Sequence, residues 1–341
     1  MMLSRPRFAH VLFAMVCRVI LLGACFASGH AYAEPAQWKV EGWKTNFDRK
    51  TVEWHEIQSG GPPKDGIPSI DDPLFVPASA DTTLARTEPV IALEIGGEAR
   101  AYPLRVLIWH EIVNDIIGGV PVIVTYCPLC NSAIVFERRV ADRLLEFGTT
   151  GKLRNSDLVM YDRQTESWWQ QFTGTAIAGE FVGTELKLVP SRLISFDEFR
   201  TRHRDGRLLV PREPGARAYG RNPYGGYDST ATPFLYQGDL PKGIEPMARV
   251  IVVRADRTKP LVVTLEHVRE AGAVVIGDIE VTWRAGQASA IDDAEIAKGR
   301  DIGTVDVVQV EPGGERKPVA YDVTFAFVAH AFHPESSIIR R

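Results

Sequence analysis

Cysteine is scarce in this chain, whose 341 residues include four. Cys17 and Cys25 fall among the first 33 residues, so the rest of the chain keeps two, Cys127 and Cys130. So few cysteines exclude a fold held together by a framework of long-range disulfides. The two remaining thiols stand in the string Cys127-Pro128-Leu129-Cys130, directly after the apolar run 120–126. Such a pair closes a small disulfide ring or binds one soft metal ion, which makes it the leading candidate for chemistry.

Long apolar runs are absent after residue 34. A membrane-spanning helix needs about 20 consecutive apolar residues, so none is expected there. The first 33 residues have the pattern of a secretory signal peptide: three arginines, a short apolar stretch over 19–26 and the cleavage motif Ala31-Tyr32-Ala33. We predict cleavage after Ala33 and a periplasmic or secreted product. The alternative is a lipoprotein, because Leu22-Gly23-Ala24-Cys25 resembles a lipobox that would carry a lipid anchor on Cys25.

An excess of positive charge is also absent. The formal net charge is −4, and it becomes more negative once the three arginines of the leader are removed. We therefore expect no nucleic-acid partner. The 308 residues that follow the leader are enough for one large domain or two smaller ones.

Local patterns divide the chain into four parts after the signal peptide at 1–33. Residues 34–84 are broken by Gly, Pro and Asp and read as an extended N-terminal lead-in. In 85–180 the patterns predict a hairpin over 90–95 and 99–102, a helix from Pro103 to about Ile116, and a buried strand over 120–126 that exits at the cysteines. Residues 181–244 form a crossing segment rich in aromatic residues, Gly and Pro, and 245–338 follow it.

The last part resembles the second. Residues 250–253 are similar to 90–93, Pro260-Leu261 to Pro103-Leu104, 279–283 to 122–126, and 319–322 to 159–162, in the same order. We therefore predict an α+β, mainly β protein made of two fused strand-hairpin-helix-strand repeats that pack as one pseudo-symmetric unit. Repeat 1 at 85–180 carries the CxxC site, and repeat 2 at 245–338 is a scaffold copy without it.

The thiol pair leads to a hypothesis of thiol-disulfide or peroxide-type redox chemistry. Cys127 would be the attacking thiolate, Cys130 the resolving thiol, and His110 the proton acceptor, because its ordinary pKa of about 6.5 lies near working pH. The partner would be a small-molecule or protein thiol or disulfide, and no cofactor is required. The β-prone run 134–136 after the cysteines argues against a thioredoxin fold. Asn114 stands where a zinc-peptidase motif starting at His110 needs its second histidine.

Three alternatives stay open. The chain could bind Cu(I) or Zn(II) through Cys127, Cys130, His110 and His333, which follows the apolar run 324–331 that we predict to be a strand. The thiol pair could be purely structural. The chain could also be an extracellular ligand-binding module that uses the aromatic loop 219–236 as its surface.

Several motifs carry a resemblance to a known family. They occur in the order 109–115 (WHEIVND), 126–133 (YCPLCNSA), 151–158 (GKLRNSDL) and 161–165 (YDRQT), followed by 222–224 (NPY) and 331–334 (AFHP). Over residues 75–338 the chain resembles the bacterial family called domain of unknown function 3179. The resemblance implies an exported protein without an assigned activity. Some members of that family are labelled selenoproteins, which implies a reactive, easily oxidised site at the cysteine motif.

Overall fold

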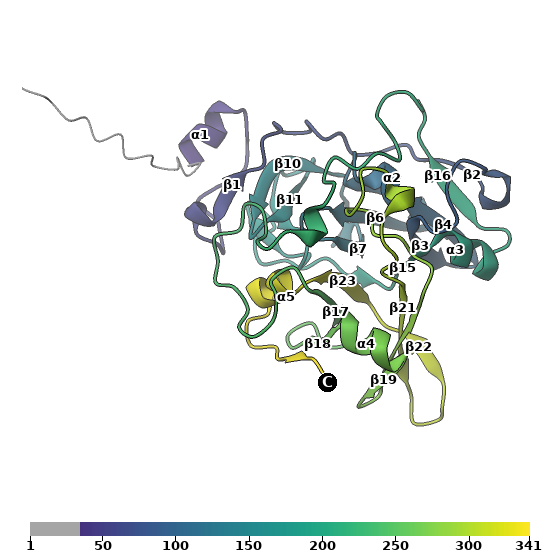
Figure 1. Cartoon of the computed structure of the whole chain (residues 1–341). Helices are drawn as coiled ribbons and strands as arrows, with labels where there is room; N and C mark the ends of the chain where they lie inside the picture. The colour runs from purple at the N-terminus through teal and green to yellow at the C-terminus, as the bar shows by residue number, and fades with distance from the viewer. Residues whose placement is uncertain (1–34) are drawn as a thin grey trace, which may run out of the picture. The chain divides into compact units, whose positions relative to one another are not determined.

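The computed structural model describes residues 35–341, which belong to one compact unit. The predicted signal peptide, its cleavage site and the lipobox cysteine lie outside the described residues. The described chain is mainly β, as predicted, with five sheets of four or five strands arranged in a ring that resembles a five-bladed propeller (Figure 1). A two-stranded hairpin accompanies them. None of the helices in the described part of the chain is long and apolar enough to cross a membrane.

The cysteines belong to an antiparallel sheet of order β14-β7-β6-β5. Its strands are β5 (Ile112–Ile117), β6 (Val120–Cys127), β7 (Ser132–Glu137) and β14 (Leu188–Val189). The inner strand β6 is almost continuously apolar because both of its faces are covered, so from Val122 to Cys127 every residue is buried.

A second antiparallel sheet has the order β1-β10-β11-β12-β13. Its strands are β1 (Ile57–Ser59), β10 (Phe147–Arg154), β11 (Asp157–Asp162), β12 (Trp168–Gln170) and β13 (Ala176–Ala178). The small hairpin is β8 (Arg139–Val140) and β9 (Arg143–Leu144). Helix α1 (Pro35–Val40) precedes this sheet and buries Trp38 in an aromatic cluster with Trp168.

Two further sheets share the same arrangement of four strands, and the first of them has a fifth strand at its edge. The first has the order β15-β3-β4-β16-β2, from β2 (Leu74–Pro77), β3 (Pro89–Ile95), β4 (Glu98–Pro103), β15 (Arg192–Ser195) and β16 (Arg207–Val210). The second has the order β23-β17-β18-β24, from β17 (Arg249–Val253), β18 (Leu261–Thr264), β23 (Tyr321–Phe325) and β24 (Ile338–Ile339). In both, a later strand pairs antiparallel with the first strand of a hairpin and another pairs parallel with its second strand.

The fifth sheet, β19-β20-β21-β22, consists of β19 (Ala273–Ile276), β20 (Ile279–Arg284), β21 (Thr304–Val310) and β22 (Arg316–Pro318). The remaining α-helices are α2 (Leu104–Leu107), α3 (Phe196–Arg202), α4 (Leu265–Ala271) and α5 (Ala326–Phe332). Short 3-10 helices are η1 (Trp54–Glu56), η2 (Ala78–Ala80), η3 (Tyr227–Ser229) and η4 (Ile296–Lys298).

The predicted pair of repeats is not confirmed in the form in which we derived it. That form equated 319–322 with 159–162, but β23 occupies the position beside β17 that β15 occupies beside β3, whereas 159–162 belong to β11 in another sheet. The same order of hairpin, short helix and hairpin does occur in β3 to β6 and in β17 to β20.

Two element predictions were wrong. The helix predicted from Pro103 to about Ile116 ends at Leu107, and the rest of that run forms β5. Gly118 and Gly119, with φ of 54° and 78°, make the two-residue turn between β5 and β6 instead of ending a helix. The run 324–331 is not a strand, because β23 ends at Phe325 and α5 begins at Ala326. Over 112–117 pairing with β6 overrides the helical spacing, whereas in 324–331 the pairing of β23 with β17 ends at Phe325 and the chain continues as a helix.

Candidate metal and thiol site

The two cysteines lie at the turn of a hairpin. Cys127 ends β6 and stands opposite Ser132, the first residue of β7, so no helix follows the pair. Asn131 adopts φ of 50°, a left-handed conformation that asparagine tolerates, and its N–H donates to the Pro128 carbonyl at 3.1 Å. This turn keeps the two thiols at one end of the sheet.

A second hairpin brings a carboxylate to the thiols. Asn155 and Ser156 connect β10 to β11 with φ of 53° and 65°, the pattern of a type I′ turn, and Asp157 begins β11. The Cys127 Sγ lies 3.8 Å from the Ser156 carbonyl oxygen. One ligand atom from each of Cys127, Cys130 and Asp157 lies within 4.8 Å of the other two, and all three residues are buried.

The Asp157 carboxylate is half satisfied. Its Oδ2 accepts hydrogen bonds from Gln170 Nε2 at 2.6 Å and from the Phe172 N–H at 2.9 Å. Its Oδ1 is buried and accepts no hydrogen bond from residues 35–341. Burial raises the pKa of Asp157 to about 6. The hydrogen bonds from Gln170 and Phe172 and a weaker interaction with the Cys130 thiol oppose that rise. One oxygen is therefore available to a proton or to a cation.

Both cysteines are free thiols. Burial raises the pKa of Cys127, and a hydrogen bond from the Cys130 thiol offsets part of that rise. Burial and the neighbouring Cys127 raise the pKa of Cys130 well above the ordinary thiol value. Ionisation of either thiol in this setting requires a positive charge or a base beside it.

Glu111 is a second buried carboxyl near the thiols. It follows α2 with φ of 58°, and its carbonyl accepts the Tyr126 N–H at 2.8 Å. Burial, with the charge of Asp157, raises the pKa of Glu111 to about 8, so this carboxyl is protonated at neutral pH. When ionised, Glu111 would raise the pKa of Cys127 further.

Neither histidine proposed from the sequence joins the group formed by the cysteines and Asp157. His110 lies after α2, where Nδ1 is 2.8 Å from the Pro68 carbonyl oxygen and Nε2 is 2.8 Å from the Tyr219 hydroxyl. Burial lowers the pKa of His110. His333 follows the end of α5, and its buried Nε2 has no hydrogen-bond partner among residues 35–341.

The segment predicted to be a scaffold copy contacts the cysteine hairpin directly. Asp322 in β23 accepts hydrogen bonds from Ser132 Oγ at 2.6 Å and from the Ala133 N–H at 2.9 Å. Thr324 Oγ1 donates to the Cys130 carbonyl at 2.7 Å. Strand β23 therefore fixes the hairpin from one side.

The aromatic segment between the predicted repeats covers the hairpin from another side. The Tyr227 hydroxyl donates to the Leu129 carbonyl at 3.0 Å, and Ser156 Oγ donates to the Phe234 carbonyl at 2.6 Å. Tyr227 is itself buried, so its ring contributes to the core more than to an outer surface.

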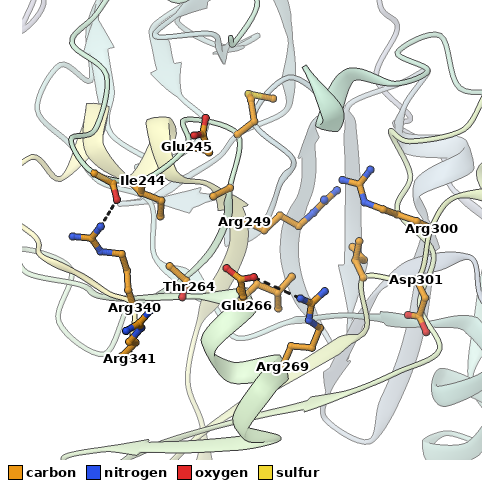
Figure 2. A pocket seen from close by; sticks show the side chains of 15 residues that line it. Ile244, Glu245, Arg249, Thr264, Glu266, Arg269, Arg300, Asp301, Arg340 and Arg341 are labelled. Carbon is orange, nitrogen blue, oxygen red and sulfur yellow. Dashed lines mark hydrogen bonds and ion pairs between the residues drawn. The ribbon is translucent and has the colours of Figure 1, made fainter. Parts of the chain in front are cut away.

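A separate open pocket of about 1030 Å³ lies between α4 and the C-terminal residues. Figure 2 shows five arginines around it, but several are already paired. Arg300 binds Asp228 and Asp292, Arg340 donates to the Gly243 carbonyl, and Arg269 lies 3.8 Å from Glu266. The cysteines do not line this pocket.

Sequence reasoning missed Asp157, Glu111 and Asp322. Asp157 and Glu111 fall inside two of the motifs that carry the family resemblance, 151–158 and 109–115, so that resemblance held a usable signal. Asp322 had no such signal, because its role depends on β23 lying against the cysteine hairpin.

The family model described as "Protein of unknown function (DUF3179)" matches residues 64–336. No curated protein and no solved structure matches the chain. Since the matched region covers most of the chain and includes the cysteine hairpin, Asp157 and β23, the chain belongs to the DUF3179 family.

Proposed function

We propose that this protein binds one soft or borderline metal ion through Cys127, Cys130 and Asp157. The observation that carries the proposal is the buried Asp157 carboxylate: Asp157 belongs to the same group as the two thiols, and its Oδ1 accepts no hydrogen bond from residues 35–341. A buried polar atom without a partner is costly, and a metal ion would satisfy it while stabilising both thiolates.

The charges of the ligands favour Zn(II) over Cu(I). Two thiolates and one carboxylate carry three negative charges, which Zn(II) reduces to one and Cu(I) to two. Zinc also accepts sulfur and carboxylate oxygen together, whereas Cu(I) prefers soft ligands alone. A closed zinc site needs a fourth ligand, and Glu111, a buried carboxyl coupled to both Cys127 and Asp157, would have to lose its proton to serve as one.

Metal analysis and thiol titration of one anaerobically purified sample test this proposal. The expected result is one zinc per chain, with two thiols that become titratable after chelation. Cys127→Ser and Cys130→Ser should each abolish zinc retention, and Asp157→Asn should weaken it. Asp142→Asn, at an exposed position between β8 and β9, is the matched control and should retain zinc. A wild-type protein that fails to take up zinc or Cu(I) would refute the proposal.

A second candidate function is dithiol redox chemistry, as the sequence suggested. Its specific support is that the Cys130 thiol donates toward Cys127 and favours the Cys127 thiolate, in line with Cys127 as the attacking sulfur. Asp157, with a pKa of about 6, replaces His110 as the proton acceptor nearest the pair. In this reaction hydrogen peroxide would oxidise both thiols to a disulfide and leave as two water molecules. Because both sulfurs are buried, a small oxidant suits the site better than a protein disulfide.

The redox candidate has its own test. A catalytic pair should have a dithiol potential between roughly −120 and −270 mV, the span of known oxidoreductases. Cys130→Ser should then form a mixed disulfide or a sulfenic acid at Cys127. A protein that holds zinc and resists stoichiometric peroxide in its zinc-bound form would support the metal proposal instead.

We further propose export to the periplasm or cell exterior, since the first 33 residues have the composition of a signal peptide. We also propose that the two sheets of shared topology derive from one duplicated unit. The shared strand order is its support.

A further inference from the structure

Arg254 directly follows β17 and carries a buried, unpaired guanidinium edge. The residue is 8% exposed, and its Nε and Nη2 are both fully buried without a hydrogen-bond partner among residues 35–341. These two nitrogens form one edge of the guanidinium. In proteins such an edge binds an oxyanion through two parallel N–H donors.

The charge of Arg254 also lacks a direct partner. No carboxylate in residues 35–341 forms an ion pair with it; Asp322 acts on it from farther away and already accepts hydrogen bonds from Ser132 and Ala133. Burial lowers the pKa of Arg254 to about 10, so the group stays cationic at neutral pH. A buried cation without a paired anion is strongly destabilising, which makes this edge unusual in a folded protein.

A second unused polar atom borders the same aromatic ring. The Arg254 guanidinium lies 4.3 Å from the centroid of the Phe172 ring, and the His333 ring lies 5.9 Å from the same centroid. His333 Nε2 is buried and unpartnered, and burial with the charge of Arg254 lowers the pKa of His333 to about 4. A neutral imidazole offers an N–H donor from this atom in one of its tautomers.

We propose that Arg254 Nε and Nη2, together with His333 Nε2, bind a small monovalent oxyanion of the carboxylate type, such as formate, bicarbonate or the carboxylate of a small ligand. One charge is favoured over two because Asp157 and Asp322 already act on Arg254, and the neighbouring Arg257 donates to the Leu186 and Thr173 carbonyls. Phe172 links this site to the cysteines, since its N–H donates to Asp157 Oδ2. The anion site does not depend on the metal proposal, because none of its donors belongs to the Cys127, Cys130 and Asp157 group.

Thermal unfolding of the full chain with added anions tests the inference. Sodium formate should raise the Tm along a saturating curve, whereas sodium chloride and sodium phosphate at the same ionic strength should not. Arg254→Lys keeps the charge but loses the paired donors, so its apparent Kd for formate should rise about tenfold or more. Arg269→Gln, in the open pocket of Figure 2, is the control and should respond like the wild type.

Several results would overturn the inference. The first is a wild-type Tm that does not rise along a saturating curve with formate. The second is a Tm rise in Arg254→Lys equal to that of the wild type. The third is loss of the Tm rise in Arg269→Gln, which would assign the anion to the open pocket. Should Arg254→Lys fail to fold, His333→Phe at the half-buried end of α5 serves instead, and it should also weaken the formate response. Zinc content is measured in the same samples to keep the two proposals separate. A variant that loses the formate response but retains zinc has lost the anion site and kept the metal site.

Discussion

Neutralising Glu111 should stabilise the metal-free protein at alkaline pH and leave it unchanged in acid. The pKa of Glu111 is raised from 4.5 to about 8 by burial. A folded-state pKa above the unfolded value favours folding below pH 4.5, and this contribution is lost as the pH rises through about 8. A tenfold change in proton affinity is worth about 1.4 kcal/mol, so the full loss amounts to about 5 kcal/mol. Glu111→Gln stays neutral at every pH and should avoid this loss.

Urea unfolding at pH 5, 7 and 8.5, with a chelator present, measures the effect. The stability difference between Glu111→Gln and the wild type should be small at pH 5 and grow steadily to several kcal/mol at pH 8.5. Glu266→Gln, whose side chain is 74% exposed, is the control and should show no such growth. If the free energy of unfolding of Glu111→Gln and of the wild type changed in parallel with pH across this range, the reasoning would be refuted. Such a result would mean that the buried carboxyl does not titrate.

Three other substitutions have defined outcomes. Gly151 has φ of 70°, and a Cβ there would collide with the Pro62 carbonyl. Gly151→Ala should therefore lower the free energy of unfolding by about 2 kcal/mol or more, and an unchanged urea midpoint would contradict this. Asp228 forms a buried ion pair with Arg249 at 2.6 Å, so Asp228→Ala should lower the unfolding free energy by about 3–5 kcal/mol, and a loss below 1 kcal/mol would mean that the charge of Arg249 is satisfied elsewhere. Asp322→Ala removes the acceptor that orients the start of β7, so zinc affinity should fall about tenfold. Competition with a chelator measures that affinity, and an unchanged affinity would show that β23 does not position the thiols.

Local patterns predicted the hairpin and the cysteine strand well. Strands β3 and β4 and the turn at Gly96 and Gly97 follow alternation and turn chemistry, which are properties of neighbouring residues. The same reasoning failed over 104–116, where apolar residues at helical spacing form a short helix and then β5. Pairing with β6 outweighs helical spacing there, and that pairing involves residues beyond the window that was read.

The candidate site divides in the same way. The sequence identified Cys127 and Cys130 because two thiols at this spacing have few other uses, and it supported family membership through a series of short motifs. It did not bring Asp157 to the thiols, since a carboxylate thirty residues along the chain is one among many until the turn at Asn155 and Ser156 is formed. It also favoured His110, which proved to be bound to Pro68 and Tyr219.

Chain composition and spacing were therefore sufficient to predict a mainly β protein and to single out one pair of thiols as its candidate site. Which groups lie near the thiol hairpin, and whether they are charged, depends on contacts between distant segments: β11 supplies Asp157 beside the sulfurs, β23 supplies Asp322 against Ser132, and the residue after β17 supplies Arg254, whose charge acts on Asp157. Burial is the physical reason. It raises the pKa of Asp157 and Glu111 and lowers that of Arg254, and burial is a property of the assembled sheets that short-range sequence patterns do not contain.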